Sequence, residues 1–290
     1  MNRDVLYRGR LAPSPTGYLH AGHATTFWCA QERCRKNNGA LILRIEDLDR
    51  ARCRPEFAES ILEDLHWFGL RWDEGPFLQS ERRALYLQAW RQLRDLGSIY
   101  PCTCSRRDVL SAADAPHWGD EDTIYPGACR PSSLTIPSAE NPVGVNWRFR
   151  VSEGEATEFL DRCAGRQRAM AGRDFGDFVV WRKDDVPAYQ LAVVADDAEM
   201  QITEVVRGAD LLRSTFRQLL LYRALGLAAP EFYHAPLVVD SLGKRLAKRD
   251  HALSLCTLRA RGVAPEQIRE RFLPPMWEPP LCGDKSPLGI

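Results

Sequence analysis

The chain has 290 residues and 44% apolar content, which is enough for one large domain or two ordinary ones with a real core. It carries 39 basic and 39 acidic residues, which excludes a globally basic nucleic-acid-binding protein, so contact with RNA would need local patches. No run of about eighteen apolar residues occurs and the N-terminus lacks an apolar segment, so we expect neither a membrane span nor a secretory signal. Nine scattered cysteines, an odd number, favour reduced thiols and a cytoplasmic protein.

The predicted elements alternate between strands and helices. The first ones are a strand, a helix, a β-rich run and two helices, over residues 5–11, 21–37, 40–45, 55–69 and 80–97. Pro55 suits the first turn of its helix and Ser80 is a good N-cap. Later the chain alternates again as strand, helix and strand, over residues 202–207, 210–226 and 237–239. This order predicts a parallel α/β sheet.

Residues 99–185 interrupt this alternation with turns, prolines and two hairpin-like strands, over 145–151 and 178–183. We therefore predict an inserted region within an α/β domain. The expected division is a catalytic-type α/β domain, an insertion and a short C-terminal segment with one helix, over residues 1–98 with 186–245, 99–185, and 246–290 with the helix at 265–272.

The stretch LAPSPTGYLHAGH, residues 11–23, forms the first strand-to-helix turn. In an open α/β sheet such a turn lies at the ligand edge, where the helix N-terminus suits phosphate. Prolines stiffen this loop, glycines permit close approach, and two histidines at i and i+3 share one side of the helix entrance: Pro13, Pro15, Gly17, Gly22, His20 and His23. Taken alone, the stretch also fits a proline-rich loop with two surface histidines.

Four segments resemble, in order, the signature blocks of class I aminoacyl-tRNA synthetases, in the form that glutamyl-tRNA synthetases use. They are GRLAPSPTGYLHAGH, RIEDLDRAR, VRGADLL and GKRLAKRDHA, at residues 9–23, 44–52, 206–212 and 243–252. The resemblance, which spans residues 7 to 252, implies a Rossmann-like class I catalytic domain with a zinc-bearing insertion and no anticodon-binding domain. Among these enzymes the chain looks most like the truncated paralogues that attach glutamate to queuosine in the anticodon of tRNA(Asp).

The resemblance also implies an ATP site, with ATP bound as its magnesium complex. Its residues would be His20, Gly22, His23, Arg245 and Lys248, of which His20, His23 and Lys248 would be catalytic. Lys248 matches the second lysine of the KMSKS loop and should grip the leaving phosphates. Arg245 and Ala247 depart from that pattern, which keeps a positive charge but loses a hydroxyl, so altered ATP handling is expected.

A site for glutamate needs arginines for its two carboxylates and a carboxylate for its ammonium. The resemblance implies the set Arg10, Ala12, Ser14, Glu46, Tyr189 and Arg207. Arg44 and Glu46 alternate on a predicted strand and so face the same side, although a surface salt bridge is the alternative for Arg44. Asp196 and Asp197 follow in a matching segment without an assigned role.

The insertion carries a possible metal site. Cys102 and Cys104 lie two residues apart on a predicted strand and project together, and Cys129 follows a Pro-Gly turn. Three thiolates still leave tetrahedral zinc in need of a fourth ligand. His117 is chemically the better donor, whereas the resemblance implies Tyr125 and one zinc ion per chain. Buried free thiols are the alternative.

We expect an ATP-dependent ligase that forms glutamyl-adenylate and transfers glutamate to queuosine in tRNA(Asp). RNA contact should be local, through the insertion and residues such as Arg106 and Arg107, and the protein should be a monomer. The alternatives are a short glutamyl-tRNA synthetase that charges the tRNA terminus, and a catalytically silent paralogue that senses RNA or an amino acid. A nucleotidyltransferase of the same superfold is a weaker rival, because it would not need the glutamate-binding set.

Overall fold

The central sheet of the computed structural model is parallel; the structure describes residues 6–105, 108, 124–238 and 254–272. Its first three strands pair in the order β1 (Arg8–Leu11), β2 (Ala40–Ile45) and β3 (Glu74–Leu78). On the other side of β1 lie β10 (Glu204–Gly208) and its parallel neighbour β11 (Glu231–Ala235). A backbone hydrogen bond of 2.9 Å, from Thr203 N to Arg8 O, joins the group β1–β3 to the pair β10–β11. The predicted parallel α/β sheet is confirmed.

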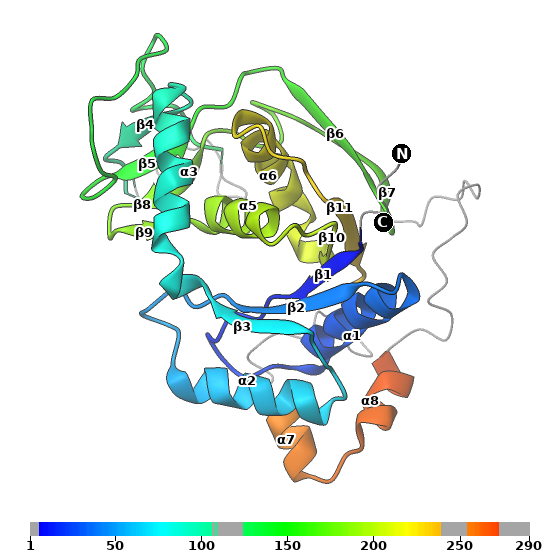
Figure 1. Cartoon of the computed structure of the whole chain (residues 1–290). Coiled ribbons are helices and arrows are strands. Elements are labelled where there is room, and N and C mark those ends of the chain that lie inside the picture. The colour runs from blue at the N-terminus through cyan, green and yellow to red at the C-terminus, as the bar shows by residue number, and fades with distance from the viewer. Residues whose placement is uncertain (1–5, 106–107, 109–123, 239–253, 273–290) are drawn as a thin grey trace.

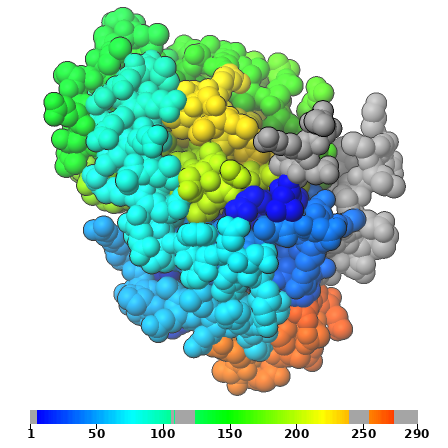
Figure 2. Space-filling view, viewed as in Figure 1, coloured from blue at the N-terminus to red at the C-terminus, as the bar shows by residue number. Residues whose placement is uncertain are grey.

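Helices cover both faces of this sheet (Figure 1). One face carries four of them, α1 (Ala21–Lys36), α2 (Pro55–Trp67), α7 (Leu255–Ala260) and α8 (Pro265–Phe272). The opposite face carries α3 (Arg83–Asp95), α5 (Tyr189–Glu199) and α6 (Leu212–Ala224). Figure 2 shows α7 and α8 at the end of the molecule, against the early part of the chain. Within the described ranges, every helix is too short or too polar to cross a membrane.

The alternation of side chains along β2 explains why both faces are covered. Leu41, Leu43 and Ile45 belong to the apolar core under α1 and α2, whereas Ile42 belongs to the core under α3 and α5. Because successive side chains of a strand point to opposite faces, this run of apolar residues requires cover on both sides. Arg44 lies on the same face of β2 as Ile42, and it is also fully buried.

The strands of the region 99–185 belong to two different sheets. A four-stranded antiparallel sheet has the order β4 (Ile99–Cys102), β5 (Asn146–Phe149), β8 (Phe178–Arg182) and β9 (Val186–Pro187). The predicted strands at 145–151 and 178–183 are therefore confirmed. A second hairpin, β6 (Ala156–Asp161) with β7 (Gly165–Met170), pairs through β6 with β11 and so extends the main sheet.

Some predicted boundaries are wrong. The strand expected at 237–239 lies earlier, at β11, and Leu237 and Val238 are outside it, while residue 239 is outside the described residues. Pro236 follows β11 directly, and a proline has no N–H with which to continue the ladder. The remaining expected strands and helices are found, most with ends shifted by a few residues.

Ser80 is not the N-cap of its helix. A 3₁₀ turn, η1 (Gln79–Glu81), precedes α3, whose N-cap is Arg82. The Ser80 hydroxyl donates instead to Asp47 Oδ2 at 2.6 Å, and its backbone N–H donates to Asp47 Oδ1 at 2.8 Å. Because Ser80 lies inside the 3₁₀ turn, it does not occupy the position before α3 from which a side-chain oxygen accepts the first helical N–H groups.

Candidate active site

A cavity of about 1340 Å³ opens at the carboxyl edge of the sheet. All the expected glutamate- and ATP-site residues within the described ranges line it: Arg10, Ala12, Ser14, His20, Gly22, His23, Glu46, Tyr189 and Arg207. This is where an open α/β sheet binds its ligands. Arg245 and Lys248 lie outside the described residues, as do Ala247, Arg106, Arg107 and His117.

The two histidines of the opening turn form the N-terminal cap of α1. His20 is the N-cap residue, and its Nδ1 accepts the N–H of Gly22 at 3.1 Å. His23 Nδ1 accepts the N–H of His20 at 3.4 Å, and the two rings lie 3.8 Å apart between centroids. A neutral ring whose Nδ1 accepts carries its proton on Nε2. The capping bonds therefore leave an Nε2–H donor on each ring. Both histidines line the cavity, so the alternative of two surface histidines without a role is not favoured.

Gly22 lies close to the His20 ring. A Cβ at residue 22 would lie 3.1 Å from His20 Cε1 and 3.2 Å from its Nδ1, so the ring would have to shift by a few tenths of an ångström. We expect Gly22→Ala to lower the rate of ATP-dependent activation about tenfold, because misplaced donors stabilise the transition state poorly. Alanine favours helix over glycine by about 0.5–1 kcal/mol, so thermal stability should not fall.

Gly17 provides the matched control for this prediction. It lines the same cavity, yet no atom lies within 4 Å of a Cβ built there. Gly17→Ala should keep both activity and stability. Equal activity of the two variants would show that the position of the His20 ring does not matter.

A buried set of charges lies beneath the cavity. Arg44 donates to Asp197 Oδ1 at 2.6 Å and to Glu46 Oε1 at 3.0 Å, and its Nε lies 3.7 Å from Asp196 Oδ2. Arg10 Nε lies 3.6 Å from the same Asp197 oxygen. The Arg44 side chain is 0% exposed, so the alternative of a surface salt bridge is wrong. Arg44 instead holds the carboxylate of Glu46 at the cavity.

Asp196 has a structural role that sequence analysis did not assign. Its carboxylate accepts from Arg82 Nε at 2.7 Å, from Gln79 Nε2 at 2.7 Å and from the Tyr86 hydroxyl at 2.9 Å. These contacts join α5 to η1 and α3. Asp196 and Asp197 therefore divide the work, because Asp197 faces the two arginines and Asp196 fixes the neighbouring helix.

Burial works against the charges that face the cavity. It raises the pKa of the Glu46 carboxyl, although Arg44 opposes the shift. It also lowers the pKa of the Arg10 guanidinium, although Asp197 opposes this shift. An α-amino acid that placed its ammonium near Glu46 and a carboxylate near Arg10 would supply each charge with a new partner.

Arg207 is held from three sides. It donates through Nη2 to Thr215 Oγ1 at 2.8 Å, through Nε to His234 Nε2 at 3.1 Å and through Nη1 to the Tyr189 hydroxyl at 3.4 Å. His234 in turn contacts Asp161 at 2.6 Å. No spacing within the chain links Thr215, His234 or Asp161 to the recognised blocks, so these contacts of Arg207 were not predictable from the sequence.

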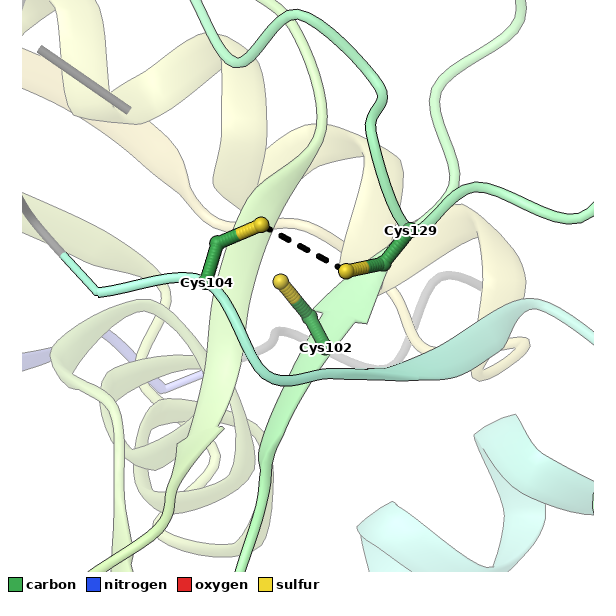
Figure 3. A group of neighbouring side chains, drawn as sticks. All are labelled: Cys102, Cys104 and Cys129. Atoms are coloured by element: carbon green, nitrogen blue, oxygen red, sulfur yellow. Dashed lines mark hydrogen bonds between the residues drawn. The ribbon is translucent and has the colours of Figure 1, made fainter. Parts of the chain in front are cut away.

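The three expected cysteines form one cluster (Figure 3). The sulfurs of Cys102, Cys104 and Cys129 lie within 4.8 Å of one another, and they could hold a metal ion. The Tyr125 hydroxyl lies 3.5 Å from both Cys102 Sγ and Cys104 Sγ. Zinc at about 2.3 Å from sulfur and about 2 Å from oxygen would put tetrahedral ligands about 3.5–3.8 Å apart, so this donor set fits.

The cluster borders the cavity, because Cys104 and the neighbouring Tyr125 also line the cavity wall. Arg148 also lies at this wall, with its Nε 3.2 Å from Cys102 Sγ and its guanidinium carbon 3.8 Å from the centre of the Tyr125 ring. The other described cysteines are free thiols outside this cluster: Cys29, Cys34, Cys53, Cys163 and Cys256.

Comparisons with known proteins identify the family of this chain. A family model of class I tRNA synthetases (E and Q), catalytic domain, matches residues 7–279. A glutamyl-Q tRNA(Asp) synthetase of Symbiobacterium thermophilum is 48% identical over 271 residues, which cover 90% of this chain and 83% of that protein. The enzyme of the same name from Chromobacterium violaceum is 43% identical over 286 residues, which cover 98% and 92% of the two chains.

Solved structures give the same fold. The crystal structure of a glutamate tRNA ligase from Elizabethkingia meningosepticum in complex with its amino acid superposes with a TM-score of 0.72 and 31% identity. The match covers 84% of this chain and 52% of that one, so this chain spans about half the length of that ligase. The predicted Rossmann-like fold of a class I catalytic domain is confirmed.

Proposed function

Because the chain belongs to the class I tRNA synthetases, among the glutamyl-Q tRNA(Asp) synthetases, we propose that it activates glutamate with ATP and transfers it to queuosine in tRNA(Asp). One observation carries the proposal: a single cavity unites the capped N-terminus of α1 with the charges of Arg10, Glu46 and Arg207. The first part suits phosphates and the second suits a dicarboxylic amino acid.

In the first step, an α-carboxylate oxygen of glutamate attacks the α-phosphorus of ATP. A bond forms between them, the bond from that phosphorus to the bridging oxygen breaks, and pyrophosphate leaves. The Nε2–H groups of His20 and His23, with the N-terminus of α1, donate to phosphate oxygens as charge develops. Lys248 and Arg245 would hold the leaving pyrophosphate, which magnesium accompanies in the ATP complex.

Glutamate is recognised by opposite charges. Arg10 and Arg207 bind its carboxylates, and Glu46 accepts from its ammonium. Ala12, Ser14 and Tyr189 complete the contacts. Glutamine should be a poor substrate, because its amide NH2 replaces an acceptor oxygen and leaves a buried guanidinium N–H unpaired.

In the second step, a hydroxyl of the queuosine cyclopentenediol attacks the carbonyl carbon of the adenylate. An ester bond forms, the bond from that carbon to the phosphate oxygen breaks, and AMP leaves with the electron pair. The hydroxyl proton is released to solvent, which balances the step. No covalent link to the protein is required, so catalysis rests on position and on charge.

We propose a structural zinc ion at the cysteine cluster. Its ligands would be Cys102, Cys104, Cys129 and Tyr125. The ion would act as a clamp, because it would stabilise the fold of the turn-rich region beside the cavity. The proposed setting is a cytoplasmic monomer. The free thiols support a reducing compartment.

The zinc proposal predicts one zinc ion per chain by elemental analysis of native protein. Cys104→Ser should lose the metal, keep part of its glutamate activation and lose most transfer to RNA, because the clamp would order the turn-rich region, whereas Arg10 and Arg207 lie on strands of the central sheet. Cys163→Ser, a free thiol elsewhere, should keep the metal. A zinc-free native protein would contradict the assignment. If Tyr125→Phe kept full zinc affinity while His117→Ala lost it, the fourth ligand would be His117.

The acceptor experiment tests the function itself. Labelled glutamate should be transferred to tRNA(Asp) that carries queuosine and not to the same tRNA without it, and native tRNA(Glu) should stay uncharged. Glutamate-dependent exchange of pyrophosphate into ATP should proceed without any tRNA. Charging of tRNA(Glu) would favour a short conventional synthetase. Absence of both exchange and transfer would favour the silent sensor.

A further inference from the structure

We infer that Asp161 and His234 are positioning residues for Arg207, and that they set the orientation in which its guanidinium meets a carboxylate of the amino acid. The inference rests on the proposed glutamate site. It assigns a role in substrate recognition to a hairpin, β6–β7, whose other residues extend the sheet.

The contacts of Arg207 leave a defined part of its guanidinium for substrate. An arginine has five N–H donors. Three are used by His234, Thr215 and Tyr189, which leaves one N–H on Nη1 and one on Nη2. The guanidinium carbon also lies 5.7 Å from the centre of the Phe232 ring. These two N–H groups, one on each terminal nitrogen, are left to donate to a carboxylate.

The contacts of His234 decide which of its nitrogens carries the proton. Its Nε2 accepts the Nε–H of Arg207 at 3.1 Å and lies 3.2 Å from Thr215 Oγ1. That nitrogen must therefore be unprotonated, and the proton lies on Nδ1. Nδ1 is 2.6 Å from Asp161 Oδ2, and both side chains are 0% exposed. Asp161 thus accepts the hydrogen bond from Nδ1–H, which fixes the ring in this form.

The other protonation states of the His234 ring would disturb Arg207. A proton on Nε2 would face the Nε–H of Arg207 donor to donor, in a place that water does not reach. A doubly protonated ring would also repel the guanidinium. Burial lowers the pKa of His234, which favours the neutral ring that this geometry requires.

Asp161 is itself held by the turn of the hairpin. Its Oδ1 accepts the backbone N–H groups of Cys163 at 2.9 Å and Ala164 at 2.7 Å. His234 lies opposite Arg207 in the parallel pair β10–β11, and Asp161 lies opposite Phe232 in the pair β11–β6. The turn after β6 is therefore connected to Arg207 through the side chains of Asp161 and His234.

The test is a double-mutant cycle on glutamate-dependent pyrophosphate exchange. Asp161→Asn keeps the shape but presents an N–H donor to Nδ1, which favours the Nε2–H ring. We expect the KM for glutamate to rise about 10- to 100-fold while the KM for ATP changes less than about twofold. His234→Gln can place a carbonyl oxygen near the former Nε2 and accept from Arg207, so its effect should be smaller.

In the His234→Gln background, Asp161→Asn should add little to the KM for glutamate, because Asp161 acts through the ring. Additive effects would overturn the inference, since a merely structural aspartate would act in either background. Asp64→Asn removes another fully buried carboxylate, outside the cavity wall, and should leave the KM for glutamate unchanged.

The state of the ring can be measured without any activity. Nitrogen NMR of the imidazole in the wild-type protein should show the Nδ1–H form of His234, and Asp161→Asn should convert it to the Nε2–H form. An Nε2–H ring in the wild-type protein would overturn the inference even if exchange were normal. A protein that neither bound nor activated glutamate, yet held the Nδ1–H ring, would instead refute the proposed function.

Discussion

Arg10→Met is expected to lower kcat/KM for glutamate in pyrophosphate exchange by about 100-fold or more. Loss of one partner from a buried charge contact typically costs about 2–5 kcal/mol, and Arg10 is 4% exposed at the cavity. The loss should fall mainly on the KM for glutamate, with the KM for ATP nearly unchanged. Steady-state exchange kinetics with each substrate varied in turn would measure it.

Arg8 offers a matched control for this variant. It is the other arginine on the same side of β1, two residues away, but it pairs with Glu74 at 2.7 Å and does not line the cavity. Arg8→Met should keep glutamate kinetics within about twofold and cost less than about 1 kcal/mol of stability. Similar kinetic losses in both variants would mean that Arg10 acts through the fold and not through substrate contact.

Arg44→Met is expected to lower the free energy of unfolding by about 3–5 kcal/mol. The substitution leaves Glu46, Asp196 and Asp197 around a neutral side chain in a fully buried place. Arg82→Met should cost less, because Arg82 is 17% exposed and Asp196 keeps its other donors. Urea unfolding of the two variants and the wild-type protein would give the values.

A second change separates lost charge balance from lost packing. If unpaired carboxylates cause the loss, Arg44→Met combined with Asp197→Asn should be more stable than Arg44→Met alone, since one uncompensated charge is gone. If the double variant were less stable by the sum of both single effects, packing of the arginine side chain would be the main cause.

The α/β order and the cavity residues were predictable because each recognised block is local in sequence. The turn from 11 to 23 contains a strand end, a loop and a helix start, so its residues meet wherever the rest of the chain lies. The same holds for Cys102 and Cys104, which are two residues apart on and after β4. Local spacing was sufficient there, and the resemblance placed the blocks around one site.

The contacts that fix these residues were not predictable, because they join distant segments. Asp161 and His234 are 73 residues apart, and Arg44 and Asp197 are 153 apart. The helix α5 was also missed. Most of its residues are buried, so it lacks the polar face, repeated every three to four residues, by which a surface helix is recognised. Ser80 was assigned as a cap because the competing Asp47 lies 33 residues away.

The buried charges around Arg44 also constrain how this sequence can change over generations. A substitution that removes one of Arg10, Arg44, Glu46, Asp196 or Asp197 alone unbalances the buried charges, and the resulting protein is less stable before any second change can restore the balance. Neutral drift by single steps is therefore blocked at these positions. They should vary together or not at all, whereas an exposed pair such as Arg35 and Glu32 is free to drift one residue at a time.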